Sequence, residues 1–112
     1  MTITVFYDRR MVGAVADNGD VQLDRGIDAL GRRHPDRRWA AGLAAFARDV
    51  QTGAHPGPYT EKAACAFARA RLLPTQEFAP LAAFSDRALA AYFRVPAEQV
   101  RAQRADLGLT WN

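Results

Sequence analysis

Four side chains of the kinds that bind metals or act in catalysis occur within 32 residues of one another: His34, His55, Glu61 and Cys65. Imidazole, thiolate and carboxylate groups bind zinc and related metals, and a cysteine beside a histidine is the pairing of a thiol nucleophile. No local motif links the four, however. Both histidines fall in polar loops, and a single cysteine often packs as a small apolar residue. The structural interpretation is favoured, and a metal site and a Cys65 nucleophile remain as alternatives.

Glu61 is the most informative of the four because of its place in residues 61–73, which have the pattern of a helix. It precedes Ala64 by three residues and Ala68 by seven, so we expect its side chain to point with the packed face. A carboxylate aimed inward is costly unless a partner satisfies it. The alternative is an ordinary role at a helix N-terminus, helped by the helix dipole or by an ion pair with a nearby arginine.

Composition limits the classes of protein that are compatible with the chain. A length of 112 residues, 49% of them apolar and 24% charged, predicts one soluble domain, residues 1–112, with a modest core. No apolar run is long enough to cross a membrane, no export signal is evident, and the single cysteine fits a reducing compartment. We therefore expect a cytoplasmic protein with no membrane partner. Its net charge of +3 is too small to indicate nucleic-acid binding by itself.

The first part of the chain predicts a three-stranded antiparallel meander over residues 1–24. Residues 2–7, 11–16 and 21–23 are rich in apolar and β-branched side chains with period-two alternation. The pair Asn18-Gly19 accepts positive φ at both positions, so we expect a tight hairpin turn there.

The middle of the chain predicts the helices that would hold the candidate groups. Residues 25–37 are mostly a connector, in which Asp24 caps a short helical turn. Residues 37–50 carry a continuous apolar stripe, and Asp36 is the expected N-cap of this helix. After a Pro- and Gly-rich loop, residues 61–73 form the next helix, which ends before Pro74.

The last third predicts a loop and then two helices. Residues 75–84 are read as the loop, which contains Pro80. Ser85 caps a helix through Phe93, with Leu89, Tyr92 and Phe93 inward. A short turn at Val95-Pro96 leads into the final helix, which Gly108 ends.

The order of these pieces resembles the ImmA/IrrE family of zinc metallopeptidases, regulators that accompany phage and mobile-element repressors. The resemblance covers roughly residues 12–109. It is carried by Glu-x-x-Ala-x-x-Phe-Ala-x-x-x-Leu-x-Pro in residues 61–74 and by Leu-Ala-x-x-Phe-x-Val-Pro-x-x-x-Val in residues 89–100. It implies a zincin-like scaffold, in which residues 36–74 correspond to the protease helices and residues 85–109 to a C-terminal helical pair.

The catalytic motif of that family is absent from this chain. The family carries His-Glu-x-x-His after an arginine-aromatic pair, and a glutamate on the next helix is the third zinc ligand. Arg38-Trp39 matches the lead-in, which places Leu43 and Ala47 at the histidine positions and Ala44 at the general base. Only Glu61, at the third ligand position, is kept. The resemblance therefore implies a protein without protease activity, cofactor or catalytic residue, in which Glu61 is vestigial.

The segment 86–107 has the spacing of a helix-turn-helix. In a DNA reader the second helix would present Ala97, Glu98, Arg101 and Ala102, which make few base contacts. Arg101 and Arg104 are the expected phosphate contacts of this alternative, and Arg94 stands where the turn usually has glycine.

The sequence thus predicts an α+β domain, a small three-stranded antiparallel meander followed by four or so helices. The leading hypothesis is a non-catalytic ImmA/IrrE-like pseudoprotease that binds a protein such as a repressor, an antitoxin or a similar regulator. Its expected surface is the groove between the meander and the first long helix. Its candidate binding arginines, suited to an acidic partner, are Arg33, Arg37 and Arg38. The alternative is a DNA-binding regulator that uses Arg101 and Arg104.

Overall fold

The chain begins with a three-stranded antiparallel sheet in the computed structural model, which describes residues 1–109. The strands are β1 (Ile3–Tyr7), β2 (Arg10–Val15) and β3 (Val21–Leu23), in the order β1-β2-β3. Tyr7 pairs with Arg10, so only Asp8 and Arg9 connect β1 to β2. The predicted meander is confirmed, and β1 and β3 are its two edges.

The tight hairpin turn lies at Asp8-Arg9 and not at Asn18-Gly19, so that prediction was wrong. Asp8 and Arg9 have φ of 51° and 65°, the signs that a two-residue turn matching the sheet twist requires. Of the other pair only Gly19 has positive φ, and the connection from β2 to β3 spans five residues. Asn18 instead uses its side chain, whose Oδ1 accepts from Asp20 N.

Within residues 1–109, six α-helices and one 3₁₀ turn follow the sheet, so the α+β class is confirmed, but the expected number of helices was too low. The helices are α1 (Arg25–Asp28), α2 (Pro35–Gln51), α3 (Glu61–Leu72), α4 (Thr75–Phe78), α5 (Asp86–Phe93) and α6 (Ala97–Asp106), and the 3₁₀ turn is η1 (Ala79–Leu81). α4 and η1 replace most of the predicted loop, because Phe78 is a fully buried anchor there.

Side chains cap the starts of α1 and α2, and the cap of α2 is not the residue that was expected. Asp24 caps α1 as predicted, since Oδ2 accepts from Gly26 N and Ile27 N. The cap of α2 is His34, whose Nδ1 accepts from Asp36 N at 3.1 Å. Pro35 explains the shift, because its fixed φ suits the first helical position and moves the start upstream of Asp36.

The first hydrophobic core joins one face of the sheet to α2 and α3. Its buried members are Val5, Val12, Val15, Ile27, Trp39, Ala40, Leu43, Phe46, Ala47, Ala64 and Ala68. Small residues allow α2 and α3 to pack closely. A Cβ added at Gly42 of α2 would lie only 3.2 Å from the Cβ of Ala68 of α3, so a larger residue at position 42 would push the helices apart.

A second core lies at the other end of the molecule, among α4, α5 and α6. It contains Leu73, Phe78, Leu89, Phe93, Val95 and Val100, and Leu72 packs against both cores. Tyr92, predicted to point inward, is 67% exposed. In this short helix Leu89 and Phe93 are one turn apart and bury the same stripe, so Tyr92 falls beside it.

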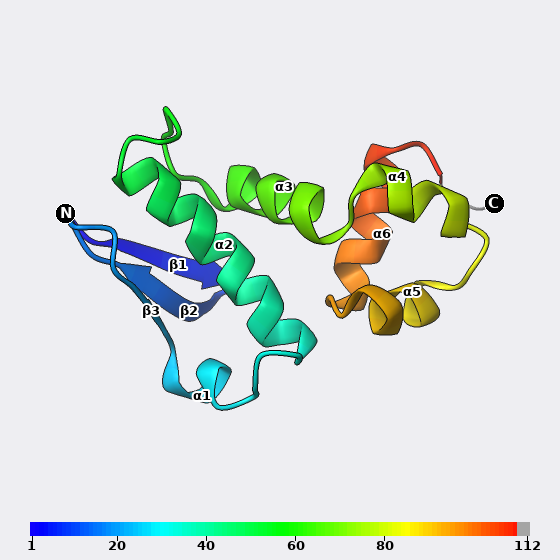
Figure 1. The fold of residues 1–112 in the computed structure, drawn as a ribbon, viewed down its shortest axis with the longest axis horizontal. Coiled ribbons are helices and arrows are strands. Elements are labelled where there is room, and N and C mark those ends of the chain that lie inside the picture. The colour runs from blue at the N-terminus through cyan, green and yellow to red at the C-terminus, as the bar shows by residue number, and fades with distance from the viewer. Residues whose placement is uncertain (110–112) are drawn as a thin grey trace.

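The two cores give the molecule an elongated outline, with extents of 44 × 31 × 22 Å. Figure 1 shows the sheet and α2 at one end, α4 to α6 at the other, and α3 running between them. In residues 1–109 there is no helix with the length and apolar content needed to cross a membrane.

Candidate functional site

The three positions aligned with the protease motif are all buried, and two of them, Leu43 and Ala47, belong to the first core. Leu43, Ala44 and Ala47 are each 1% exposed or less, on the buried face of α2. Their side chains carry only hydrocarbon, so they offer neither a metal ligand nor a base. A zinc ion therefore does not fit these residues, and Glu61 alone cannot supply a three-ligand site.

Glu61 lies on the surface, so the expectation that it points inward was wrong. It opens α3, its side chain is exposed, and its Oε1 accepts from Asp8 N at 3.3 Å. Thr60 Oγ1 caps the same helix by accepting from Ala63 N. Among residues 1–109 no arginine forms an ion pair with Glu61. At the first helical position a side chain can leave the buried stripe, and here a loop amide and solvent satisfy the carboxylate.

Glu61 lines an open hollow between the end of β1 and the starts of α3 and α6. The lining residues are Tyr7, Asp8, Glu61, Lys62, Cys65, Glu98 and Gln99. Burial and, less strongly, the charge of Glu61 raise the pKa of Cys65, while Arg69 opposes them. A raised pKa disfavours the thiolate, which is the nucleophilic form of a cysteine.

Both histidines make contacts within local structure. His34 caps α2, and His55 Nδ1 accepts from Gly57 N at 3.1 Å while its ring packs edge-on against Phe46. Across residues 1–109 no group of three His, Cys, Asp or Glu side chains is arranged to hold a metal ion. The four candidate donors from the sequence are thus not brought together as one site.

A chain of polar contacts joins the sheet to α3 and α6. Tyr7 OH donates to Glu98 Oε1 and accepts from Gln99 Nε2. Arg69 Nη1 then donates to Gln99 Oε1, and Arg69 Nη2 donates to Asp106 Oδ2. We call these five residues the polar seam. Only the fold reveals it, because Tyr7 and Glu98 are 91 residues apart in sequence.

The polar seam occupies the part of α6 that would have to read DNA. Glu98 is engaged by Tyr7, and Gln99 is buried between Tyr7 and Arg69. A recognition helix enters the major groove through residues near its start, and here that start packs against β1 and α3.

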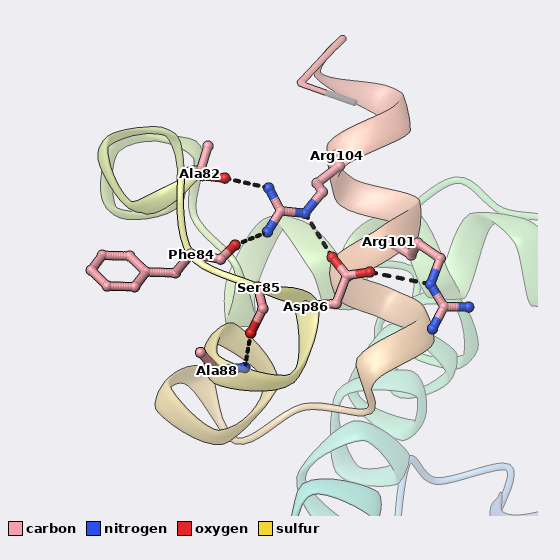
Figure 2. Close-up of polar contacts among 7 residues, drawn as sticks. All are labelled: Ala82, Phe84, Ser85, Asp86, Ala88, Arg101 and Arg104. Carbon is pink, nitrogen blue, oxygen red and sulfur yellow. Dashed lines mark hydrogen bonds and ion pairs between the residues drawn. The ribbon is translucent and has the colours of Figure 1, made fainter. Parts of the chain in front are cut away.

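Arg104 is a buried structural residue, so its expected contact with phosphate was wrong. It is 4% exposed, and its guanidinium donates to Asp86 Oδ1 at 2.7 Å and to the carbonyls of Ala82 and Phe84, as Figure 2 shows. The same carboxylate also accepts from Arg101 Nε at 3.3 Å. Asp86 therefore holds both arginines to the start of α5.

The arginines predicted near residues 32–38 have three different environments. Arg33 is exposed and forms no ion pair with residues 1–109. Arg37 pairs with Asp28 at 2.9 Å. Arg38 is partly buried and donates Nη1 to the carbonyls of Phe93 and Arg94, at the C-terminus of α5.

Five arginines line one groove where the start of α2 meets the ends of α3 and α5, and we call it the arginine groove. Its lining comprises Arg32, Arg33, Arg38, Arg71, Leu72, Pro74, Glu77, Tyr92, Phe93 and Arg94. Arg71 and Arg94 were not predicted as binding residues. The only signal in the sequence was the unusual Arg94 at a turn position that favours glycine.

A second hollow lies between β3 and α2 and corresponds to the groove expected between the meander and the first long helix. Its lining includes Val21 and Leu23 from the strand and Ala41 and Ala45 from the helix. β3 is an edge strand, and in residues 1–109 no further strand pairs with it. An extended segment could pair with this edge over a floor of small side chains.

Comparison of the chain with models of protein families, with curated proteins and with solved structures finds no match in any of the three.

Proposed function

We propose that this chain is a non-catalytic protein-binding domain, an ImmA/IrrE-like pseudoprotease that acts on a repressor, an antitoxin or a similar regulator of a phage or mobile element. The observation that carries the proposal is the state of the motif positions. Leu43 and Ala47 are part of the first hydrophobic core and Ala44 beside them is buried, so these positions contribute packing and not chemistry. A domain of this kind acts through its surface.

The hollow beside β3 is the proposed contact surface. Val21 is 42% exposed at the strand edge, and Ala41 and Ala45 form a low floor on α2. An edge strand offers unpaired amide and carbonyl groups, and small side chains on the facing helix leave room for the side chains of an added strand. An extended segment of the partner is expected to bind there.

Photo-crosslinking in the native host tests this surface. Benzoylphenylalanine in place of Val21 is expected to capture a discrete protein, whereas the same group in place of the exposed Ala66 on α3 is not. Ala45→Arg, which fills the hollow, is expected to reduce the Val21 crosslink, and Ala66→Arg is the matched control. Recovery of DNA without protein, or equal crosslinking from both positions, would contradict the proposal.

The resemblance to the zinc peptidases has a test of its own. We propose that Leu43→His with Ala47→His supplies two ligands one helical turn apart, and that Glu61, which is exposed in the wild type, turns inward to add the third when zinc binds. Two unpaired imidazoles in the core should lower stability by a few kcal/mol without metal. Zinc should then raise the melting temperature of this double variant but not of the wild type.

Glu61→Gln in the same double variant is the control and should weaken the zinc effect. If zinc has no effect on the double variant, the assignment to a zincin-like scaffold fails. The proposal of protein binding at β3 would not be affected, because the crosslinking experiment tests it separately.

A further inference from the structure

The arginine groove gathers five positive charges beside a single acid among the described residues that line it. Its five guanidinium groups belong to Arg32, Arg33, Arg38, Arg71 and Arg94. Within residues 1–109 none of them forms an ion pair, whereas Arg10, Arg37, Arg69, Arg101 and Arg104 all pair with aspartates. Like charges gathered in one concave surface repel one another and attract an anionic ligand. The groove is therefore built for a negatively charged partner.

Two of these guanidinium groups are held in place by the fold. Arg38 donates to the carbonyls of Phe93 and Arg94 at the C-terminus of α5. The last carbonyls of a helix have no partner within the helix and carry the negative end of its dipole, so they attract a guanidinium group. The Arg71 guanidinium lies over the Phe67 ring, 5.4 Å from its centre. Because these contacts are to carbonyls and a ring, they position the charges without cancelling them.

Arg94 occupies a backbone conformation that an arginine adopts at a cost. Its φ of 57° is left-handed, and glycine is the usual residue at such a helix end. A non-glycine residue in this conformation costs roughly 1 kcal/mol. Stability alone does not explain an arginine here. Its side chain instead adds a cation to the groove, directly beside the exposed Tyr92.

The remaining lining indicates what kind of anion fits. Leu72, Pro74 and Phe93 provide apolar surface, and Tyr92 is 67% exposed at the edge. The groove also contains one acid, Glu77, which repels phosphate and carboxylate alike, so a ligand that binds there must place its charges on the guanidinium groups and not over Glu77. Separate carboxylates with an apolar side chain between them match this mixture better than a continuous phosphate backbone does.

We infer that the arginine groove binds an extended acidic segment of a partner protein, with carboxylates on the guanidinium groups and one apolar side chain against Tyr92 and Phe93. This inference rests on the proposed protein-binding function but concerns a different hollow from the one beside β3, although Arg71 lines both. The new elements are the groove itself, the roles of Arg71 and Arg94, and the chemistry of the segment.

Fluorescence anisotropy at physiological salt tests the inference with a labelled decapeptide of Glu and Asp residues around one central Leu. The wild type is expected to bind it, and a peptide with Gln and Asn in place of the acids is not expected to bind. Arg32→Gln with Arg33→Gln should weaken binding about tenfold or more, since two charge-assisted contacts are lost. Tyr92→Ala should weaken it by a smaller factor.

The matched control is Arg25→Gln with Arg87→Gln, which removes the same charge from exposed arginines elsewhere and should change the affinity less than about twofold. Equal losses in the two double variants would show general charge attraction and overturn the inference. So would tighter binding of a labelled single-stranded oligonucleotide than of the acidic peptide. If the peptide fails to bind while crosslinking at Val21 succeeds, the inference about the arginine groove is contradicted and the proposed protein-binding function is still supported.

Discussion

The Tyr7 hydroxyl donates to Oε1 of Glu98 across 2.5 Å and joins the last residue of β1 to the first turn of α6. Gln99 Nε2 donates to the same hydroxyl, and Arg69 continues the contacts to Asp106. The polar seam therefore links the end of the molecule that contains the sheet to the end built from α4, α5 and α6. The arginine groove likewise draws its lining residues from both ends.

Tyr7→Phe is expected to lower the free energy of unfolding by about 1–2 kcal/mol, because Glu98 and the buried Gln99 each lose a hydrogen-bond partner. Tyr92→Phe is the matched control, since that hydroxyl is on an exposed side chain, and it should change stability by less than about 0.5 kcal/mol. Urea denaturation of the three proteins measures the difference. Equal stabilities for wild type and Tyr7→Phe would show that the seam adds nothing to the fold.

Tyr59→Phe should leave stability at pH 7 unchanged or slightly higher, because the Tyr59 hydroxyl is buried and has no hydrogen-bond partner within residues 1–109. Burial, followed by the charges of Cys65 and Glu61, raises the pKa of Tyr59 from 10.0 to about 12. Between these values the unfolded chain releases a proton that the folded chain keeps, so stability falls as pH rises from 10 towards 12.

The substitution removes that titration, so Tyr59→Phe should lose less stability than the wild type over this alkaline range. Part of the loss should remain, because burial also raises the pKa of Tyr7. Denaturation midpoints at closely spaced pH values give the slopes. A variant whose slope matches that of the wild type would mean that Tyr59 is solvated in the folded state.

Arg104→Met should cost about 3 kcal/mol of stability. It leaves the carbonyls of Ala82 and Phe84 and one oxygen of Asp86 without their charged donor. Arg87→Met, one residue from Asp86 and exposed, is the control and should have little effect. If instead Arg104→Met folds as stably as the wild type and loses affinity for duplex DNA, Arg104 would be a nucleic-acid contact after all.

Asp86 makes the fold sensitive to acid. The hydrogen bond from Arg104, helped by Arg101, holds the pKa of Asp86 below its usual 3.8, against a smaller opposing effect of burial. A depressed pKa adds stability above the unfolded value, and this contribution is lost as pH falls through the folded value. Asp86→Asn should therefore be less stable than the wild type at pH 6, and the gap should narrow below about pH 4. A gap that stays constant from pH 6 to pH 2 would rule out this ion pair as its source.

Patterns that are local in the sequence predicted the secondary structure well. Alternation found the three strands, and the stripe from Trp39 to Val50 found α2, because both depend on which side chains one element buries. The main miss was α4, a single turn of helix too short to show a period. The position of α4 is set by the buried side chain of Phe78. The residues around Phe78 in the sequence show no periodic pattern from which its burial could be predicted.

The candidate sites were predicted less completely. The absence of a His-Glu-x-x-His motif could be read directly, since Leu43, Ala44 and Ala47 lack metal-binding atoms in any fold. The predicted inward direction of the Glu61 side chain was wrong. The first residue of a helix can point away from the buried face that the later residues of the helix form. The prediction that Arg104 contacts phosphate did not anticipate its burial. A long side chain can bury its charge when two carbonyls and a carboxylate from elsewhere in the chain surround it.

The sequence by itself determined the α+β class, the strands, the long helices and the chemistry that positions 43, 44 and 47 lack, because these depend on residue type and on spacing within one element. Tertiary structure alone decided which charges are neutralised. It buried Arg104, joined Tyr7 to Glu98 across 91 residues and gathered in one groove five arginines that form no ion pair within residues 1–109. Charge pairing depends on distances between elements, and no pattern along a single chain encodes those distances.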